Sequence, residues 1–426
     1  MKIWQILCSA ISAVSGFNLC IDFQCPQCGA PAQLEETGRV FACGFCRVKS
    51  CLIAKDFFRC VIPHSAPDGT ELIHVPYWRL KGTLFSCAAG GIHKRFMDIS
   101  HPAVSLPGFP GTLGLRTQTM KLEFRKPDMP GYFLRHTVSP EKIMQIFTAR
   151  FNAGLSSPAL CQDFVGENLS LIYAPFYAQD GQLWDAVLHH PVSADLPQGF
   201  APAALGEKAA KWRMRFVPSL CPACGWDLHT EPDAMVLFCR NCETAWQSGQ
   251  DRLVPVTFGL FPDKDPKNRV WFPFWRIQAD VSGISLQSYA DLIRAANLIK
   301  VAREEDKQSG FYFWTPAFKV QPRFFLNLCR QMTLSQPREK PVRKLPPGRI
   351  ISANFPVTQA VKSLKINLAG FLKPPSLVQS RIRDIEIRPR KYLLVLIPFQ
   401  EDHLDYFQPE FQIAVNKNML GLSGNL

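Results

Sequence analysis

The sequence predicts an α+β protein that is dominated by antiparallel strands and built as a tandem duplication. The spacing Cys-x2-Cys-x14-Cys-x2-Cys occurs twice, with the same interval both times. Further segments match between the two halves in the same order. After the cysteines, each half reads as strand, strand, helix and final strand. We therefore expect each half to be a four-cysteine unit followed by a mainly antiparallel β module with one or two helices.

The two cysteine sets have the pattern of tetrahedral metal sites. Each close pair makes a short turn, and the intervening residues form a hairpin that brings the two pairs together. Both sets open with Cys-Pro-x-Cys-Gly, in which Pro presets φ and Gly tolerates the backbone bend after the second ligand. The predicted metal ligands are Cys25, Cys28, Cys43 and Cys46 in the first set, and Cys221, Cys224, Cys239 and Cys242 in the second.

These knuckles resemble the zinc-ribbon family over residues 25–46 and 221–242 only, and the rest of the chain resembles no family. The resemblance implies a structural zinc in each ribbon, hence two zinc ions per chain, with ribbons at 22–50 and 218–246. The second knuckle of each set lacks the trailing Gly. Iron on a rubredoxin-like site, disulfides and free thiols are the alternatives.

The duplication divides the chain into segments. Beyond the cysteines, 76–80 matches 273–277 at an offset of 197, 114–118 resembles 317–321 at 203, and 171–176 resembles 394–399 at 223. The predicted organisation is an apolar N-terminal segment 1–21, a first repeat 22–190, a linker 191–217 and a second repeat 218–426.

Three helices are expected. In the first repeat, Ser139 suits the N-cap and Pro140 the first turn of a helix with one apolar face. Its counterpart spans 356–369. An additional helix, 286–305, occurs only in the second repeat.

Composition indicates a folded protein with an uneven positive charge. The net charge is +13, and residues 338–391 hold 13 Lys or Arg against three acids, a net of +10. This stretch could attract a phosphate backbone or an anionic membrane, or form a solvated basic surface. We place the candidate contacts at its densest cluster, Arg381, Arg383, Arg388, Arg390 and Lys391. Fifteen cysteines, with an odd number outside the two sets, indicate a reducing, cytoplasmic compartment.

A Trp-Arg pair recurs at Trp78-Arg79 and Trp275-Arg276. Alternation along a strand puts the two side chains on opposite faces, which could offer an aromatic platform and a phosphate contact. Core packing of each Trp, with each Arg paired to a carboxylate, is the alternative and the one we favour.

The N-terminus has three interpretations: a signal-like segment, an amphipathic helix, or a misassigned start. No apolar run reaches the length of a transmembrane span, although residues 1–20 leave peripheral membrane contact open.

No catalytic motif is recognisable, and four cysteines close a metal site, so we do not expect an enzyme. The predicted function is a zinc-binding platform for nucleic acid or other partners. The alternative is a protein-assembly adaptor that docks partners through aromatic surfaces, without nucleic acid.

Overall fold

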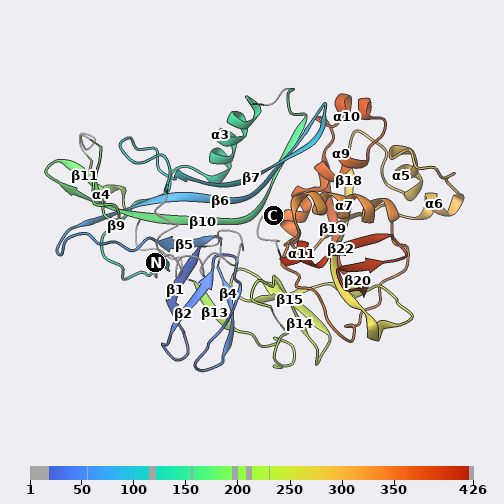
Figure 1. The fold of residues 1–426 in the computed structure, drawn as a ribbon, viewed down its shortest axis with the longest axis horizontal. Helices are drawn as coiled ribbons and strands as arrows, with labels where there is room; N and C mark the ends of the chain where they lie inside the picture. Colours follow the sequence, from blue (N-terminus) through green and yellow to red (C-terminus); the bar gives the residue numbers. More distant parts are fainter. Residues whose placement is uncertain are drawn as a thin grey trace, which may run out of the picture.

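The computed structural model describes residues 19–54, 56–114, 121–154, 157–193, 200–207, 214–229 and 231–421. Over these residues the protein is a mixed α+β structure with more strand than helix, as predicted (Figure 1). None of the helices in this described part is long and apolar enough to cross a membrane. Residues 1–18 of the predicted N-terminal segment lie outside the described residues.

Two long antiparallel strands, β6 (Leu72–Ala88) and β10 (Cys161–Gln179), form the centre of the first half. Strand β7 (Gly91–Pro102) returns along β6, and helix α3 (Pro140–Asn152) packs Ile143 into a cluster with Trp78 and Leu171. The same ten-stranded sheet includes β1 (Cys20–Gln24), β2 (Pro31–Glu35), β5 (Phe58–Val61), β8 (Leu122–Phe124), β9 (Tyr132–Phe133), β11 (Gln182–Asp185) and β12 (Pro191–Ser193).

The second half is built on a six-stranded sheet with the path β19-β18-β20-β21-β22, and β17 pairs with β20. Its strands are β17 (Phe258–Leu260), β18 (Val270–Val281), β19 (Phe313–Pro316), β20 (Ile387–Glu401), β21 (Asp405–Gln408) and β22 (Ile413–Asn416). Its helices are α5 (Tyr289–Ala295), α6 (Glu304–Gln308), α7 (Pro322–Ser335), α8 (Val357–Lys362), α9 (Leu364–Phe371), α10 (Pro375–Arg381) and α11 (Lys417–Gly421).

The metal-binding regions carry two three-stranded sheets. One has the order β13-β4-β3, from β3 (Val40–Ala42), β4 (Lys49–Ile53) and β13 (Arg215–Pro218). The other has the order β14-β15-β16, from β14 (Val236–Cys239), β15 (Thr244–Ser248) and β16 (Leu253–Val256). The segment expected to be a linker thus holds α4 (Pro202–Leu205) and most of β13, which pairs with β4 of the first ribbon.

The two halves pair their central strands in the same register. Trp78 lies opposite Leu171 across β6 and β10, and Trp275 lies opposite Leu394 across β18 and β20. Trp78 and Trp275 are 197 positions apart, and Leu171 and Leu394 are 223 positions apart. These are the offsets of the corresponding sequence matches. The pairings of β5 with β10 and of β17 with β20 are both parallel. The central strand arrangement is therefore common to both halves.

One predicted match is wrong. The backbone N–H of Ala103 donates to the carbonyl of Pro76 at 2.8 Å, and that of Ala317 donates to Pro273 at 2.9 Å. Ala317 therefore occupies the place of Ala103, at an offset of 214, and not that of Gly114. Residues 115–118, the remainder of this predicted match, lie outside the described residues.

The helices depart from expectation in three places. Helix α3 begins as predicted, with the Ser139 hydroxyl accepting the backbone N–H of Lys142 at 3.3 Å. The expected helix 356–369 is instead α8 and α9, broken at Ser363. The expected helix 286–305 is also two short helices, α5 and α6, because Asn297 follows α5 with φ of +48°. Helices α7 and α10 were not predicted.

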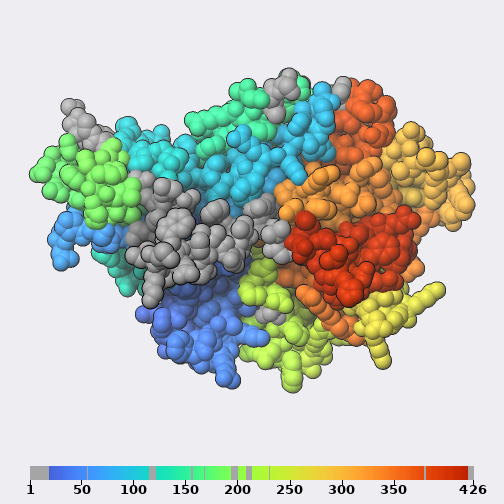
Figure 2. Space-filling model, viewed as in Figure 1, coloured from blue at the N-terminus to red at the C-terminus, as the bar shows by residue number. Residues whose placement is uncertain are grey.

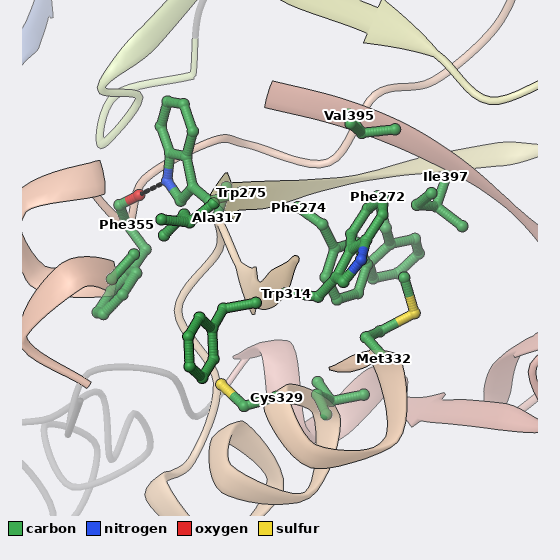
Figure 3. Packing of buried hydrophobic residues seen from close by; sticks show 14 of the residues in the cluster. Phe272, Phe274, Trp275, Trp314, Ala317, Cys329, Met332, Phe355, Val395 and Ile397 are labelled. Carbon is green, nitrogen blue, oxygen red and sulfur yellow. Dashed lines mark hydrogen bonds between the residues drawn. The ribbon is translucent and has the colours of Figure 1, made fainter. Parts of the chain in front are cut away.

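The core of the second half includes the end of the first. Figure 3 shows part of this core, where Trp275 of β18 donates its indole N–H to the carbonyl of Phe355 at 2.8 Å. Phe85 of β6 and Val165 of β10 belong to the same buried cluster, and the Phe85 ring stacks on Phe325 of α7 at 6.3 Å. In Figure 2 the cyan surface of the β6–β7 hairpin abuts the orange surface of the α9–α10 region. The two halves therefore share one hydrophobic core.

Candidate metal centres

The eight predicted cysteines gather into two clusters, one in each ribbon. Within each cluster the four sulfur atoms all lie within 4.8 Å of one another. In the first, Cys25 Sγ is 3.8 Å from Cys46 Sγ, and Cys28 Sγ is 3.7 Å from Cys43 Sγ. In the second, the corresponding separations, Cys221 to Cys242 and Cys224 to Cys239, are both 3.5 Å.

These sulfur separations fit a tetrahedral metal site. A zinc–sulfur bond of about 2.3 Å sets the edge of a tetrahedron of four sulfurs at about 3.8 Å. A disulfide would hold its sulfurs at about 2.05 Å. The arrangement therefore suits four ligands around one ion, and it could hold a metal without movement of the backbone.

The backbone turns after the ligands explain how each knuckle is made. Gly29 and Gly225 both have φ of +73°, and each donates its N–H to the carbonyl of the first cysteine of its pair, at 2.9 and 2.8 Å. Arg47 and Glu243 take the same left-handed conformation after the second pairs, with φ of +61° and +53°. The two knuckles of each ribbon are therefore alike in backbone, although only the first has the Gly.

Within each cluster, the pKa values of the cysteine thiols are shifted in opposite directions. The backbone N–H of Cys46 is the main cause that lowers the pKa of Cys43 to about 6. In the second cluster, burial and then the neighbouring Cys224 and Cys242 thiols raise the pKa of Cys239 to about 12. Four thiolates at this spacing repel one another, so a bound cation is what would allow all four to ionise.

A hydroxyl group supports only the second cluster. Thr244 Oγ1 lies 3.1 Å from Cys242 Sγ and 3.5 Å from Cys221 Sγ, and it accepts the Trp246 indole N–H at 2.9 Å. When the cysteines are thiolates, which can only accept, the Thr244 hydroxyl is the donor to sulfur. Val48 holds the corresponding position in the first ribbon, 196 residues earlier, and has no hydroxyl. Sequence reasoning missed Thr244, although a comparison of the two sets at that position would have found it.

The two candidate tryptophans lie in the core. Trp78 and Trp275 are each 1% exposed. The Trp78 indole N–H donates to the carbonyl of Val138 at 2.6 Å, just before α3, and Trp275 makes the equivalent bond just before α8. Neither ring is accessible as a stacking platform, which agrees with the core alternative.

The arginines of the two Trp-Arg pairs have different surroundings. Arg79 is buried, where it contacts Glu36 closely and donates to Asp98 at 2.8 and 2.9 Å. Arg276 is half-buried and lies over the Tyr312 ring at 4.7 Å. Sequence reasoning missed Glu36, whose burial raises its pKa against the opposing charges of Arg79 and Lys81. This buried charge cluster joins the first ribbon to β6 and is structural.

The predicted basic cluster is exposed at α10, the following turn and the start of β20. Within it, Arg388 pairs with Glu386 at 2.7 Å, and Arg390 pairs closely with Asp280. Among the described residues, Arg381 and Arg383 donate only to backbone carbonyls, at 3.3 and 3.4 Å. Pairing with two acids leaves part of the positive charge for a ligand.

Two exposed aromatic residues adjoin the metal clusters. Phe45, between Cys43 and Cys46, is 71% exposed, and Trp226, two residues after Cys224, is 62% exposed. Single exposed apolar side chains are common on protein surfaces, and what distinguishes these two is their place beside a metal ligand. Both were missed because nothing in their spacing distinguishes them from core residues.

Comparisons with protein-family models, curated proteins and solved structures found no match for this chain, so its assignment rests on the geometry of the two tetracysteine clusters.

Proposed function

We propose that each tetracysteine cluster binds one structural Zn²⁺, two per chain. The observation that carries this is the tetrahedral spacing of four sulfurs, which closes the coordination sphere and leaves no position for a substrate. Iron prefers the same ligand set. Elemental analysis and the visible spectrum of the purified protein separate the two metals. We expect two zinc ions per chain and a colourless protein; a red, iron-containing protein would contradict zinc.

We further infer that the halves arose by duplication. The shared register of the central strands and the indole hydrogen bond before each following helix support this. Two similar modules, each with its own ribbon, would give the protein two related surfaces.

We propose that the protein is a non-enzymatic nucleic-acid-binding platform. The supporting observation is the exposed arginine cluster at α10 and β20, in a region with a strong positive excess. Arginine forks match phosphate geometry, and released counterions make such binding fall steeply with salt. A cytoplasmic location stays a prediction.

The test is a variant in which Arg381, Arg383, Arg388, Arg390 and Lys391 are all changed to Gln. If the cluster binds phosphates, single-strand affinity falls and the slope of log K against log salt flattens by about 0.7 for each phosphate that the variant no longer binds. Unchanged binding in this variant would remove the cluster from the interface.

A second candidate is the protein-assembly adaptor, favoured by the exposed Phe45 and Trp226. A partner that docks on these rings would bind with little dependence on salt. Phe45→Ser and Trp226→Ser would abolish capture of such a partner and leave both metals in place, whereas the basic cluster variant would bind it normally.

A further inference from the structure

A basic groove lies where the β6–β7 hairpin meets the helices of the second half. Its volume is ≈ 630 Å³, and it is lined by Ile92 beside the hairpin turn, by Arg323, Asn327 and Arg330 of α7, and by Asn367 and Gly370 of α9. Both halves contribute to it. It is separate from the metal clusters and from the basic cluster at α10 and β20.

Helix α7 presents a polar stripe to this groove. Arg323, Asn327 and Arg330 are spaced i, i+4 and i+7, so they share one helix face, and all three are exposed. The opposite face buries Phe325, Leu328, Cys329 and Met332. The helix is therefore held in place by its core while it offers two guanidinium groups on one side.

The positive charges here have no acidic partner in the described part of the chain. Neither Arg323 nor Arg330 forms an ion pair with any described residue. The pKa of Lys94 of β7 is lowered, first by partial burial and then by the nearby Arg323 guanidinium. Lys94 and Arg323 thus lie near each other, Arg330 shares the helix face of Arg323, and no ion pair with a described residue offsets these charges, so an anion would be favoured here.

Asn367 is a buried polar residue in the lining of the groove. It is 2% exposed, it lines the groove, and its Nδ2 donates to Thr333 Oγ1 at 3.1 Å. Its Oδ1 has no hydrogen-bond partner among the described residues. A buried carbonyl oxygen without a donor is uncommon and calls for one. This oxygen is closed to solvent, so a ligand in the groove reaches it only after the side chain turns.

We propose that this groove binds a nucleotide unit. Arg323, Arg330 and Lys94 would hold the phosphate, and the apolar Ile92, Phe324 and Ile366 of the lining would contact the base. The nucleotide has two sources, a free nucleotide or one residue of a single strand. The inference rests on the proposed nucleic-acid binding only for the second source.

The test uses the full-length, metal-loaded protein with two probes, adenosine triphosphate and a fluorescein-labelled oligo-dT strand. Asn327→Asp puts a carboxylate between the two arginines with no change of side-chain size, and Arg323→Gln with Arg330→Gln removes both charges. The matched control is Lys264→Gln with Lys267→Gln, which removes the same charge from two exposed positions outside the groove. Thermal melting checks that each variant is folded.

We expect both groove variants to weaken each probe that the wild type binds by about tenfold or more, and the control to weaken it by less than about twofold. For oligo-dT, removal of two phosphate-binding side chains should flatten the salt slope by about 1.4. Equal weakening in the control, or full binding in folded groove variants, would overturn the proposal, as would a wild type that binds neither probe at about 50 mM salt.

The outcomes separate this proposal from the function proposed above. If oligo-dT binding survives in the groove variants but disappears when the α10–β20 cluster is changed, the platform stands and the groove is refuted. If adenosine triphosphate binds and oligo-dT does not, the groove stands and nucleic-acid binding is refuted.

Discussion

Arg47 and Glu243 hold a backbone conformation that suits glycine. Each ends a knuckle with positive φ, as Gly29 and Gly225 do, but each carries a Cβ that crowds the left-handed region. The metal ligands beside them fix the turn, so the strain persists in the folded protein. A glycine at either position would therefore relieve this strain and stabilise the folded protein.

Replacing Arg47 with Gly should raise the free energy of unfolding by about 0.5–1 kcal/mol, because strain is relieved beyond the entropy that glycine adds to the unfolded chain. Arg47→Ala, which keeps the Cβ, is the control and should not be stabilised. Denaturant unfolding of the metal-loaded protein measures both. A glycine variant less stable than the alanine variant would mean that the arginine side chain itself stabilises the knuckle.

Thr244 should make the second metal cluster more resistant to acid. When the cysteines are metal-bound thiolates, which can only accept, the Thr244 hydroxyl donates to sulfur, lowers the thiol pKa and lets the cluster keep its metal to lower pH. Thr244→Val should therefore release the second metal at higher pH and weaken its binding by about tenfold. The reciprocal Val48→Thr variant is the control. Release followed with a metal-sensitive dye during acid titration tests this; an unshifted midpoint would mean that the hydroxyl donates elsewhere.

At the scale of elements, the long strands β6 and β10 depend on a close approach at Gly82. A Cβ placed there would meet the carbonyl oxygen of Val165 at 2.4 Å and the Cα of Gly166 at 2.7 Å. Both neighbours are backbone, so neither can turn away, and this approach lies beside the register shift between Gly166 and Asn168.

Gly82→Ala should consequently cost about 1–3 kcal/mol or more through overpacking. Gly111→Ala serves as the control because a Cβ there meets nothing within 4 Å. Thermal melting compares the two variants. Equal melting temperatures would mean that the strands separate at this point at no cost in stability, contrary to the pairing described here.

Sequence patterns predicted elements best where local chemistry decided them. The Ser139 cap was predicted correctly because capping depends on neighbouring residues alone. The strand matches at offsets 197 and 223 were predicted correctly because the same pattern is repeated in both halves. The break at Ser363 was missed because its hydroxyl bonds the carbonyl of Ala360 at 2.7 Å inside an apolar segment. Helix α7 was missed although its signal was present: Pro322 starts it, and Phe325, Leu328, Cys329 and Met332 share one buried face.

At the scale of the whole molecule, the halves should unfold together. Phe85 of β6 is fully buried in the core of the second half, and the N–H groups of Arg39 and Val40 both donate to the carbonyl of Pro232. Strand β13, which leads into the second ribbon, pairs with β4 of the first. These contacts cross the boundary that the sequence placed at a linker.

Phe85→Ala should therefore destabilise both halves, by about 3–5 kcal/mol, in one transition. Phe96→Ala, on the same hairpin but 43% exposed, is the matched control and should cost much less. Unfolding followed by circular dichroism and by tryptophan fluorescence should coincide. Two separate transitions would show that each half folds alone.

The candidate site could be predicted only in part. The eight cysteines can be found from their spacing, because two short turns joined by a hairpin are enough to bring four thiolates together. Burial of Trp78 and Arg79, and the Glu36 contact, depend on which strands become neighbours, which local sequence does not determine. The groove at α7 could likewise not be predicted, because it forms only where a hairpin of one half meets helices of the other.

X-ray absorption at the zinc edge tests the central claim most directly. With both clusters filled, the averaged zinc environment should contain four sulfur atoms at about 2.3 Å and no nitrogen or oxygen. Cys43→Ser should halve the zinc content and leave four sulfurs around the zinc that remains. A nitrogen or oxygen shell in the wild-type protein, or no zinc edge at all, would contradict two closed tetracysteine zinc sites.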